Sequence, residues 1–261
     1  MIKILENQRL VFYQQKADAA YWDGLWQRQP DGSSLEDGNL GWLEELLVEY
    51  LPREELILDA GCGQGQYVIA LHKLGYRIKG VDYAETTISS LRSHFTDIDF
   101  EWADVSRLPE RDGHYGAYLS LGIVAHQESG PEAILREAAR VVRPGGIAIV
   151  SVPYFNRLRK MKADMGAYRH RCDGMEFYQY AFSKQEITGI LLDAGFEVLR
   201  YFPYNSYKCI AGESALVNRL VNRTLFGRDL RSVTQQLLRR MVLPEKLAGN
   251  MLVAVSRRIP A

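Results

Sequence analysis

The chain has 261 residues, 47% of them hydrophobic, and its 32 lysines and arginines balance 32 aspartates and glutamates. This length suffices for one large α/β domain with a full core, and the zero net charge gives the whole chain no electrostatic attraction to nucleic acid or anionic membranes. The three cysteines are widely spaced and no apolar run is long enough to span a bilayer, so we expect a cytoplasmic protein without a disulfide framework.

Residues 1–50 precede the first predicted sheet strand and are rich in aromatic side chains. Trp22 and Trp26 are four residues apart, so they share one face of a predicted helix. The run 30–34, Pro-Asp-Gly-Ser-Ser, ends that helix in a loop. We therefore expect an N-terminal helical lid over residues 1–50 and the main domain over residues 51–261.

The segment 56–65, LILDAGCGQG, organises the rest of the chain. Its first three residues are apolar without a polar face, which is typical of an inner strand of a parallel sheet covered by helices on both sides. A helix is predicted over residues 67–74, and its N-terminus faces the turn that precedes it. Three glycines let that turn bring backbone N–H groups against a ligand: Gly61, Gly63 and Gly65.

Two acids indicate which ligand this turn binds. A dinucleotide-binding fingerprint needs its third glycine at position 66, which is Gln66. Asp59 precedes the turn, and its carboxylate would repel a pyrophosphate but attract an ammonium group. Asp82 ends the next predicted strand, 77–82, where a carboxylate accepts hydrogen bonds from both hydroxyls of a ribose. A ribose and an amino-acid ammonium together describe S-adenosylmethionine.

Through the run 59–65 and Asp82, the chain resembles the class I S-adenosylmethionine-dependent methyltransferases. The resemblance implies a doubly wound α/β fold. Its seven-stranded, mostly parallel sheet has the order 3-2-1-4-5-7-6 with an antiparallel last strand, helices on both faces and a helical insertion before that strand. It implies S-adenosylmethionine as the cofactor, converted to S-adenosylhomocysteine. It also implies cofactor contacts from Asp59, Ala60, Gly61, Cys62, Gly63, Gly65, Asp82, Tyr83, Ala103, Asp104, Val105, Leu121, Trp22 and Trp26.

Two of these assignments keep a structural alternative. In related enzymes a similar tryptophan pair packs over the cofactor, but Trp22 and Trp26 can equally serve to anchor the lid helix to the sheet domain. Asp104 ends the third predicted strand, 99–104, where the family's acid accepts a hydrogen bond from the adenine amine. The alternative is an acid that caps a loop.

The remaining elements follow in regular alternation. Strands are predicted over 116–121, 147–152, 196–202 and 250–257, and helices over 131–142 and over 183–194, the latter behind a capping box that joins Ser183 to Glu186. Two long insertions, 154–182 and 203–249, are expected to carry substrate specificity. The second contains a cationic amphipathic segment, 216–240, which is either a contact for an anionic substrate or membrane surface, a dimer interface, or a solvated helix face.

Methyl transfer from a sulfonium needs mainly positioning and exclusion of water, and an oxygen acceptor also needs a base. His126, just past the fourth strand, is the candidate catalytic base and substrate contact, with a packing histidine as the alternative. Further candidates for contacting the substrate are Tyr154, Tyr168, His170 and Glu128. The run 170–172 offers too few ligands for zinc, so no metal is expected.

Several subclasses lack their motifs in this chain. Residues 120–123, Ser-Leu-Gly-Ile, stand where nucleic-acid amino-methyltransferases carry an Asn/Asp-Pro-Pro-Tyr-like motif, and the acids of metal-dependent catechol-type enzymes are absent after the fourth and fifth strands. We therefore expect metal-independent methyl transfer to an oxygen or nitrogen of a small-molecule, lipid-linked or sugar-linked acceptor. The alternatives are an NAD-dependent oxidoreductase and a non-catalytic S-adenosylmethionine-binding module. The sequence is also compatible with an oligomer.

Overall fold

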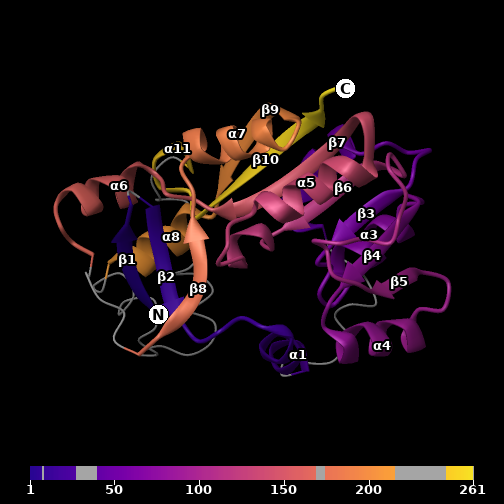
Figure 1. Cartoon of the computed structure of the whole chain (residues 1–261), viewed down its shortest axis with the longest axis horizontal. Coiled ribbons are helices and arrows are strands. Elements are labelled where there is room, and N and C mark those ends of the chain that lie inside the picture. The colour runs from indigo at the N-terminus through magenta and orange to yellow at the C-terminus, as the bar shows by residue number, and fades with distance from the viewer. Residues whose placement is uncertain (8, 28–39, 169–173, 215–244, 261) are drawn as a thin grey trace, which may run out of the picture.

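The computed structural model describes residues 1–7, 9–27, 40–168, 174–214 and 245–260. Within these ranges the strands form one seven-stranded sheet and one three-stranded sheet. Figure 1 shows the three-stranded sheet at one side of the molecule, β4, β5 and α4 at the other, and α1 at the bottom beside α4.

The large sheet has the strand order β5-β4-β3-β6-β7-β10-β9. Its strands are β3 (Ile57–Ala60), β4 (Ile78–Asp82), β5 (Asp99–Trp102), β6 (Tyr115–Leu121), β7 (Val142–Pro153), β9 (Phe196–Tyr204) and β10 (Met251–Arg258). The last strand, β10, runs antiparallel to β7 and β9, whereas the pairs from β5 to β7 are parallel. The predicted order 3-2-1-4-5-7-6 with an antiparallel last strand is therefore confirmed.

Helices cover both faces of this sheet. They are α2 (Glu44–Tyr50), α3 (Gln66–Lys73), α4 (Glu85–His94), α5 (Glu132–Val141) and α7 (Lys184–Asp193). Successive residues of a strand point to opposite faces, so Leu58 joins one buried cluster with α5 and α7, while Ile57 joins the other with α2, α3 and α4. All four residues of β3 are buried, as the unbroken apolar run predicts.

The capping box predicted for α7 is present. The Ser183 hydroxyl accepts a hydrogen bond from the Glu186 amide at 3.2 Å, and the Glu186 carboxylate accepts one from the Ser183 amide at 3.4 Å. This pair satisfies two N–H groups that the first turn of a helix leaves without partners.

The prediction of a wholly helical N-terminal lid is wrong for the first fourteen residues. They form a hairpin of β1 (Ile2–Glu6) and β2 (Arg9–Gln14), and β2 pairs with β8 (Glu176–Ala181) to complete the three-stranded sheet. Leu10 and Phe12 are two residues apart and are buried together against Phe155 and Tyr168. This period of two favours a strand over a helix. The helical part of residues 1–50 comprises α1 (Ala19–Gln27), a 3-10 turn at Gly41–Leu43 and α2.

The two insertions contain further elements in the described part of the chain. Residues 154–182 contain α6 (Arg157–Asp164) and β8, and residues 203–249 contain α8 (Ser206–Glu213) and α11 (Glu245–Ala248). The cationic segment 216–240 lies outside the described residues. Among the helices that the structure describes, none has the length and apolar character needed to cross a bilayer.

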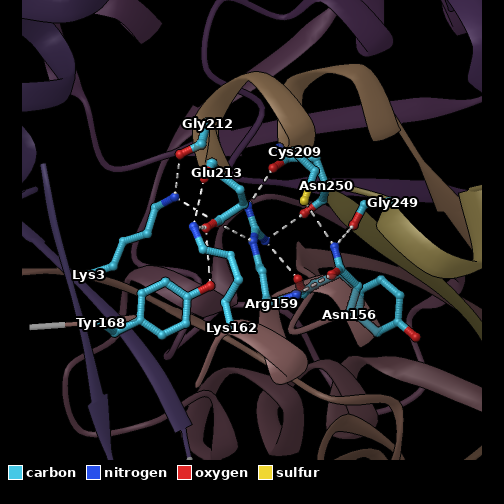
Figure 2. Close-up of polar contacts among 11 residues, drawn as sticks. Lys3, Asn156, Arg159, Lys162, Tyr168, Cys209, Gly212, Glu213, Gly249 and Asn250 are labelled. Carbon is cyan, nitrogen blue, oxygen red and sulfur yellow. Dashed lines mark hydrogen bonds and ion pairs between the residues drawn. The ribbon is translucent and has the colours of Figure 1, made fainter. Parts of the chain in front are cut away.

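Glu213, at the end of α8, links both insertions to the N-terminal hairpin (Figure 2). Its buried carboxylate accepts from Lys3 of β1 at 2.6 Å, from Arg159 at 3.0 Å and from Lys162 at 2.9 Å, the last two on α6. The Tyr168 hydroxyl donates to the same carboxylate at 3.1 Å. We call these five residues the Glu213 cluster, and it fixes α6, α8 and the small sheet relative to one another.

Candidate functional site

The glycine turn after β3 has the backbone conformation that its sequence predicts. Gly61, Gly63 and Gly65 have φ angles of +87°, +53° and +75°, a region that residues with a Cβ rarely occupy. A Cβ on Gly63 would lie 3.0 Å from the Trp26 ring, and one on Gly61 would lie 2.4 Å from the Ile123 side chain. The turn therefore requires glycine both for its conformation and for its close packing.

Asp82, at the end of β4, fixes this turn. One of its carboxylate oxygens accepts from the Gly63 amide and the other from the Ala84 amide, each at 2.9 Å. Burial raises the pKa of Asp82, and the backbone hydrogen bonds oppose that rise. Each oxygen keeps a second acceptor position, and Asp82 also lines a cavity. One carboxylate therefore both holds the turn and faces the cavity.

Asp59 has a different environment. It is 1% exposed, and among the described residues its Oδ2 atom has no hydrogen-bond partner. Burial, and then the nearby charge of Asp82, raise the pKa of Asp59 to about 7. A buried carboxylate oxygen without a partner is unfavourable, so this site is suited to a cationic ligand group.

The cavity has a volume of about 390 Å³ and lies against the carboxyl edge of the large sheet, α1 and β8. Ligands of doubly wound sheets bind at this edge. Nine of the predicted residues line the cavity: Trp22, Trp26, Gly61, Asp82, Tyr83, Asp104, Val105, His126 and Glu128.

The helix α1 is attached to the large-sheet domain beside this cavity. The Gln64 side-chain amide donates to the Trp26 carbonyl oxygen at 2.9 Å, and the Thr87 hydroxyl donates to the Asp23 carboxylate at 2.9 Å. Trp22 and Trp26 stack with ring centroids 5.7 Å apart. Trp26 therefore anchors α1 on the glycine turn, and both tryptophans line the cavity, whereas their contact with the cofactor stays a prediction.

His126 ends the short 3-10 turn Val124–His126 after β6 and lines the cavity. Its Nδ1 atom lies 2.7 Å from the Tyr178 carbonyl oxygen of β8. A carbonyl oxygen can only accept, so we assign the proton to Nδ1 and the lone pair to Nε2. Burial lowers the pKa of His126 below its usual value, which keeps the imidazole neutral near neutral pH.

Asp104 both caps a loop and lines the cavity. Its Oδ1 atom accepts from the Ser106 amide and the Ser106 hydroxyl, each at 2.8 Å. The loop-capping alternative is therefore observed, and it leaves Oδ2 of the same carboxylate for a ligand.

The other predicted residues are not in the cavity lining. Asp59 and Ala60 end β3, Ala103 follows β5, and Cys62, Gly63 and Gly65 belong to the turn before α3. Tyr154 belongs to one core cluster, Leu121 packs against the other, and Tyr168 belongs to the Glu213 cluster. His170 lies outside the described residues.

Sequence reasoning missed several cavity residues, above all Lys16 and Phe177. Phe177 reaches the cavity because β8 pairs with β2, and this pairing joins segments about 165 residues apart that no local pattern connects. Lys16 follows the unexpected hairpin. Within the described ranges, no three His, Cys, Asp or Glu side chains are grouped to hold a metal ion.

Comparison with known proteins gives consistent matches. Residues 57–146 match a family model described as a methyltransferase domain. A probable S-adenosylmethionine-dependent methyltransferase of Mycolicibacterium smegmatis is 28% identical over 54% of this chain and 52% of its own length. The chain thus matches about half the length of that relative. A ubiquinone biosynthesis O-methyltransferase of Bordetella avium is 24% identical over 76% of this chain and 86% of its own length.

A similar fold is found among solved structures. The 1,6-didemethyltoxoflavin-N1-methyltransferase of Burkholderia thailandensis, solved with S-adenosylhomocysteine bound, is 17% identical with a TM-score of 0.55, and the match covers 100% of both chains. At this identity the likeness shows a shared fold.

Proposed function

We propose that this protein transfers a methyl group from S-adenosylmethionine to an acceptor in the cavity beside His126, since residues 57–146 match a family model described as a methyltransferase domain. The observation that carries the proposal is the glycine turn, which Asp82 fixes and beside which Asp59 keeps a buried oxygen without a described partner. The sulfonium cofactor supplies an activated methyl group, and the chain supplies its position and an acceptor site shielded from water.

The residues at the turn fit this cofactor. Asp59 offers an unpaired buried oxygen to an ammonium group, and Asp82 retains acceptor positions for two hydroxyls. Asp104 offers Oδ2 to an exocyclic amine. A pyrophosphate would meet two carboxylates here, which disfavours the alternative of an NAD-dependent oxidoreductase.

His126 is the group that would accept a proton from the acceptor. Its Nε2 atom carries the lone pair because Nδ1 donates to the Tyr178 carbonyl, so the histidine is fixed in one tautomer. The proton of an acceptor hydroxyl would pass to Nε2 as its oxygen bonds to the methyl carbon, while the S–CH₃ bond breaks and its electron pair stays on the sulfur of S-adenosylhomocysteine.

We propose an oxygen acceptor with an acidified hydroxyl. His126 is a weak base because burial lowers its pKa. A phenol-like hydroxyl, with a pKa of about 10, is far closer to it than an unactivated hydroxyl, for which water at about 15.7 is the reference. The relative from Bordetella avium is named an O-methyltransferase, which also favours oxygen over nitrogen.

A transfer assay tests this function. Purified protein is incubated with methyl-labelled S-adenosylmethionine and a metabolite mixture, and products are read by mass spectrometry. We expect a labelled methyl ether together with stoichiometric S-adenosylhomocysteine. A non-catalytic binding module would instead be stabilised by S-adenosylhomocysteine without producing any labelled product.

A further inference from the structure

The lining of the cavity comes from several elements. Asp82, Tyr83 and Asp104 follow β4 and β5 and suit the nucleoside, and Phe177 of β8 and His126 also line the cavity. The Lys16 segment contacts both groups of residues. The Lys16 amide donates to the carboxylate of Glu176, the residue before Phe177, at 3.2 Å, and the carbonyl oxygen of Ala17 accepts from the Tyr83 hydroxyl at 3.2 Å.

The aspartates that line the cavity have hydrogen-bond partners, whereas its lysine has no ion pair with a described residue. Asp82 and Asp104 accept the hydrogen bonds described above, and Asp18 accepts from the Tyr21 amide at 3.0 Å. Among the described residues that line the cavity, Lys16 is the only lysine or arginine. It makes no ion pair with any residue in the described part of the chain. These residues therefore include one cation that is available to a ligand.

The cavity that Lys16 lines is aromatic. Phe177 and Trp22 line it, and the edge-on contacts of His126 with Trp22 and with Tyr178 have centroid distances of 5.0 Å and 4.8 Å. Flat apolar side chains favour a planar ring, and Lys16 is exposed.

We propose, on the basis of the proposed function, that Lys16 determines acceptor specificity by pairing with a carboxylate, so that the acceptor is an aromatic hydroxy acid. The ring packs against Phe177 and Trp22, the hydroxyl meets Nε2 of His126 and the carboxylate meets the Lys16 ammonium. The transferred proton goes to His126, so Lys16 takes part in binding and not in proton transfer.

Binding to the protein saturated with S-adenosylhomocysteine tests this assignment. The probes are 4-hydroxybenzoate and its methyl ester, together with the corresponding 3-hydroxybenzoate and 3,4-dihydroxybenzoate pairs; in each pair the ester replaces the negative charge by a methyl group. In the wild type we expect at least one acid to bind about tenfold tighter than its ester, the range of one charge-assisted hydrogen bond. Lys16→Ala should remove this preference, and Lys16→Arg should retain most of it.

Two control variants test whether the preference for acids over esters depends on Lys16 itself. Lys73→Ala removes an exposed lysine at the end of α3, away from the cavity, and should leave the preference unchanged. Glu128→Gln should leave or strengthen it, because Glu128 also lines the cavity and repels an anion.

Three results overturn the assignment. They are acids that bind no tighter than their esters in every pair, a preference that survives Lys16→Ala, and a Lys16→Ala variant that loses affinity for S-adenosylhomocysteine, which would assign Lys16 to the cofactor. Failure of the proposed function is a separate outcome, because it would leave the acid preference intact while no acceptor gives a methylated product.

Discussion

Asp59 links cofactor binding to pH. The pKa of Asp59 is about 7 in the folded protein and about 3.9 in an unfolded chain. The ligand-free fold therefore loses stability as the pH rises from about 3.9 to about 7, because the unfolded chain releases the Asp59 proton first. A bound ammonium group would favour the ionised form. We therefore expect the affinity for S-adenosylhomocysteine to rise several-fold from pH 6 to pH 7.5, with proton release, by calorimetry in two buffers of different ionisation enthalpy. A flat pH dependence together with no proton release argues against this pairing.

Replacing His126 should lower the rate of methyl transfer without changing the affinity for the cofactor. Replacing His126 by Asn removes the proposed base, so kcat should fall by about 10²–10⁴-fold while the affinity for S-adenosylhomocysteine changes little. The lowered pKa of His126 places the acid limb of the wild-type pH–rate profile below pH 6.5, because the imidazole must be neutral to act. A His126→Asn variant with wild-type kcat would make His126 a packing residue.

At the scale of elements, α1 is held on the glycine turn by the Trp26 ring and by the hydrogen bond from Gln64 to the Trp26 carbonyl oxygen. Trp26→Ala removes the ring beside Gly63 and the stacking partner of Trp22. We expect affinity for S-adenosylhomocysteine to fall about tenfold or more, since a large aromatic contact is lost on the cavity wall. Trp42→Ala is the matched control, because Trp42 stacks on Tyr204 and does not line the cavity. Equal losses in the two variants would mean that Trp26 acts through general stability.

The Glu213 cluster should stabilise the small sheet and the insertions. Glu213→Ala leaves three cations around a lost carboxylate, and the side chain is 3% exposed, so we expect a loss of about 3–5 kcal/mol in the free energy of unfolding. Glu49→Ala is the control, since its ion pair with Arg200 is 54% exposed on the Glu49 side and should contribute no more than about 1 kcal/mol. Denaturant unfolding measures both, and similar values for the two would contradict this role.

Because the Glu213 cluster contains a buried, ionised carboxylate, we expect the folding stability of the protein to fall at acidic pH. The surrounding Lys3 and Lys162 hold the pKa of Glu213 below its ordinary value despite burial. The pKa of Glu213 is lower in the folded state than in the unfolded chain, where it is about 4.3. Ionised Glu213 therefore adds to the free energy of unfolding above about pH 4.3, and this addition is lost as the pH falls through the folded-state pKa. The difference in melting temperature between wild type and Glu213→Gln should therefore shrink below about pH 4. A constant difference over this range would exclude ionisation as its cause.

For the molecule as a whole, the large sheet can be predicted from the sequence because each of its strands and turns is determined by residues close to it in the chain. The apolar run of β3, the turn glycines and the acid after β4 each lie within a few residues of the feature they determine. The small sheet was not predicted, since β2 depends on pairing with β8, which is remote in the sequence. For the same reason the Glu176 contact that places Lys16, and the position of Phe177 in the cavity, follow only from the folded chain.

The division of the chain stays a proposal. Residues 1–50 and the two insertions contribute α1, β2 and β8 around the cavity, and the large sheet contributes the turn. We propose that residues 51–153 and α1 bind the cofactor, while the insertions and the N-terminal hairpin select the acceptor. The cationic segment 216–240, outside the described residues, keeps its predicted alternatives of an anionic contact, a dimer interface and a solvated helix face.

The most direct test of the account is calorimetric titration of the wild-type protein and an Asp82→Asn variant with S-adenosylhomocysteine and, separately, with NAD. We predict that S-adenosylhomocysteine binds the wild type, that Asp82→Asn weakens this binding at least about tenfold, and that NAD gives no measurable heat of binding. Tighter binding of NAD, or an Asp82→Asn variant with unchanged affinity for S-adenosylhomocysteine, would contradict the claim that the glycine turn and its two carboxylates hold a sulfonium nucleoside.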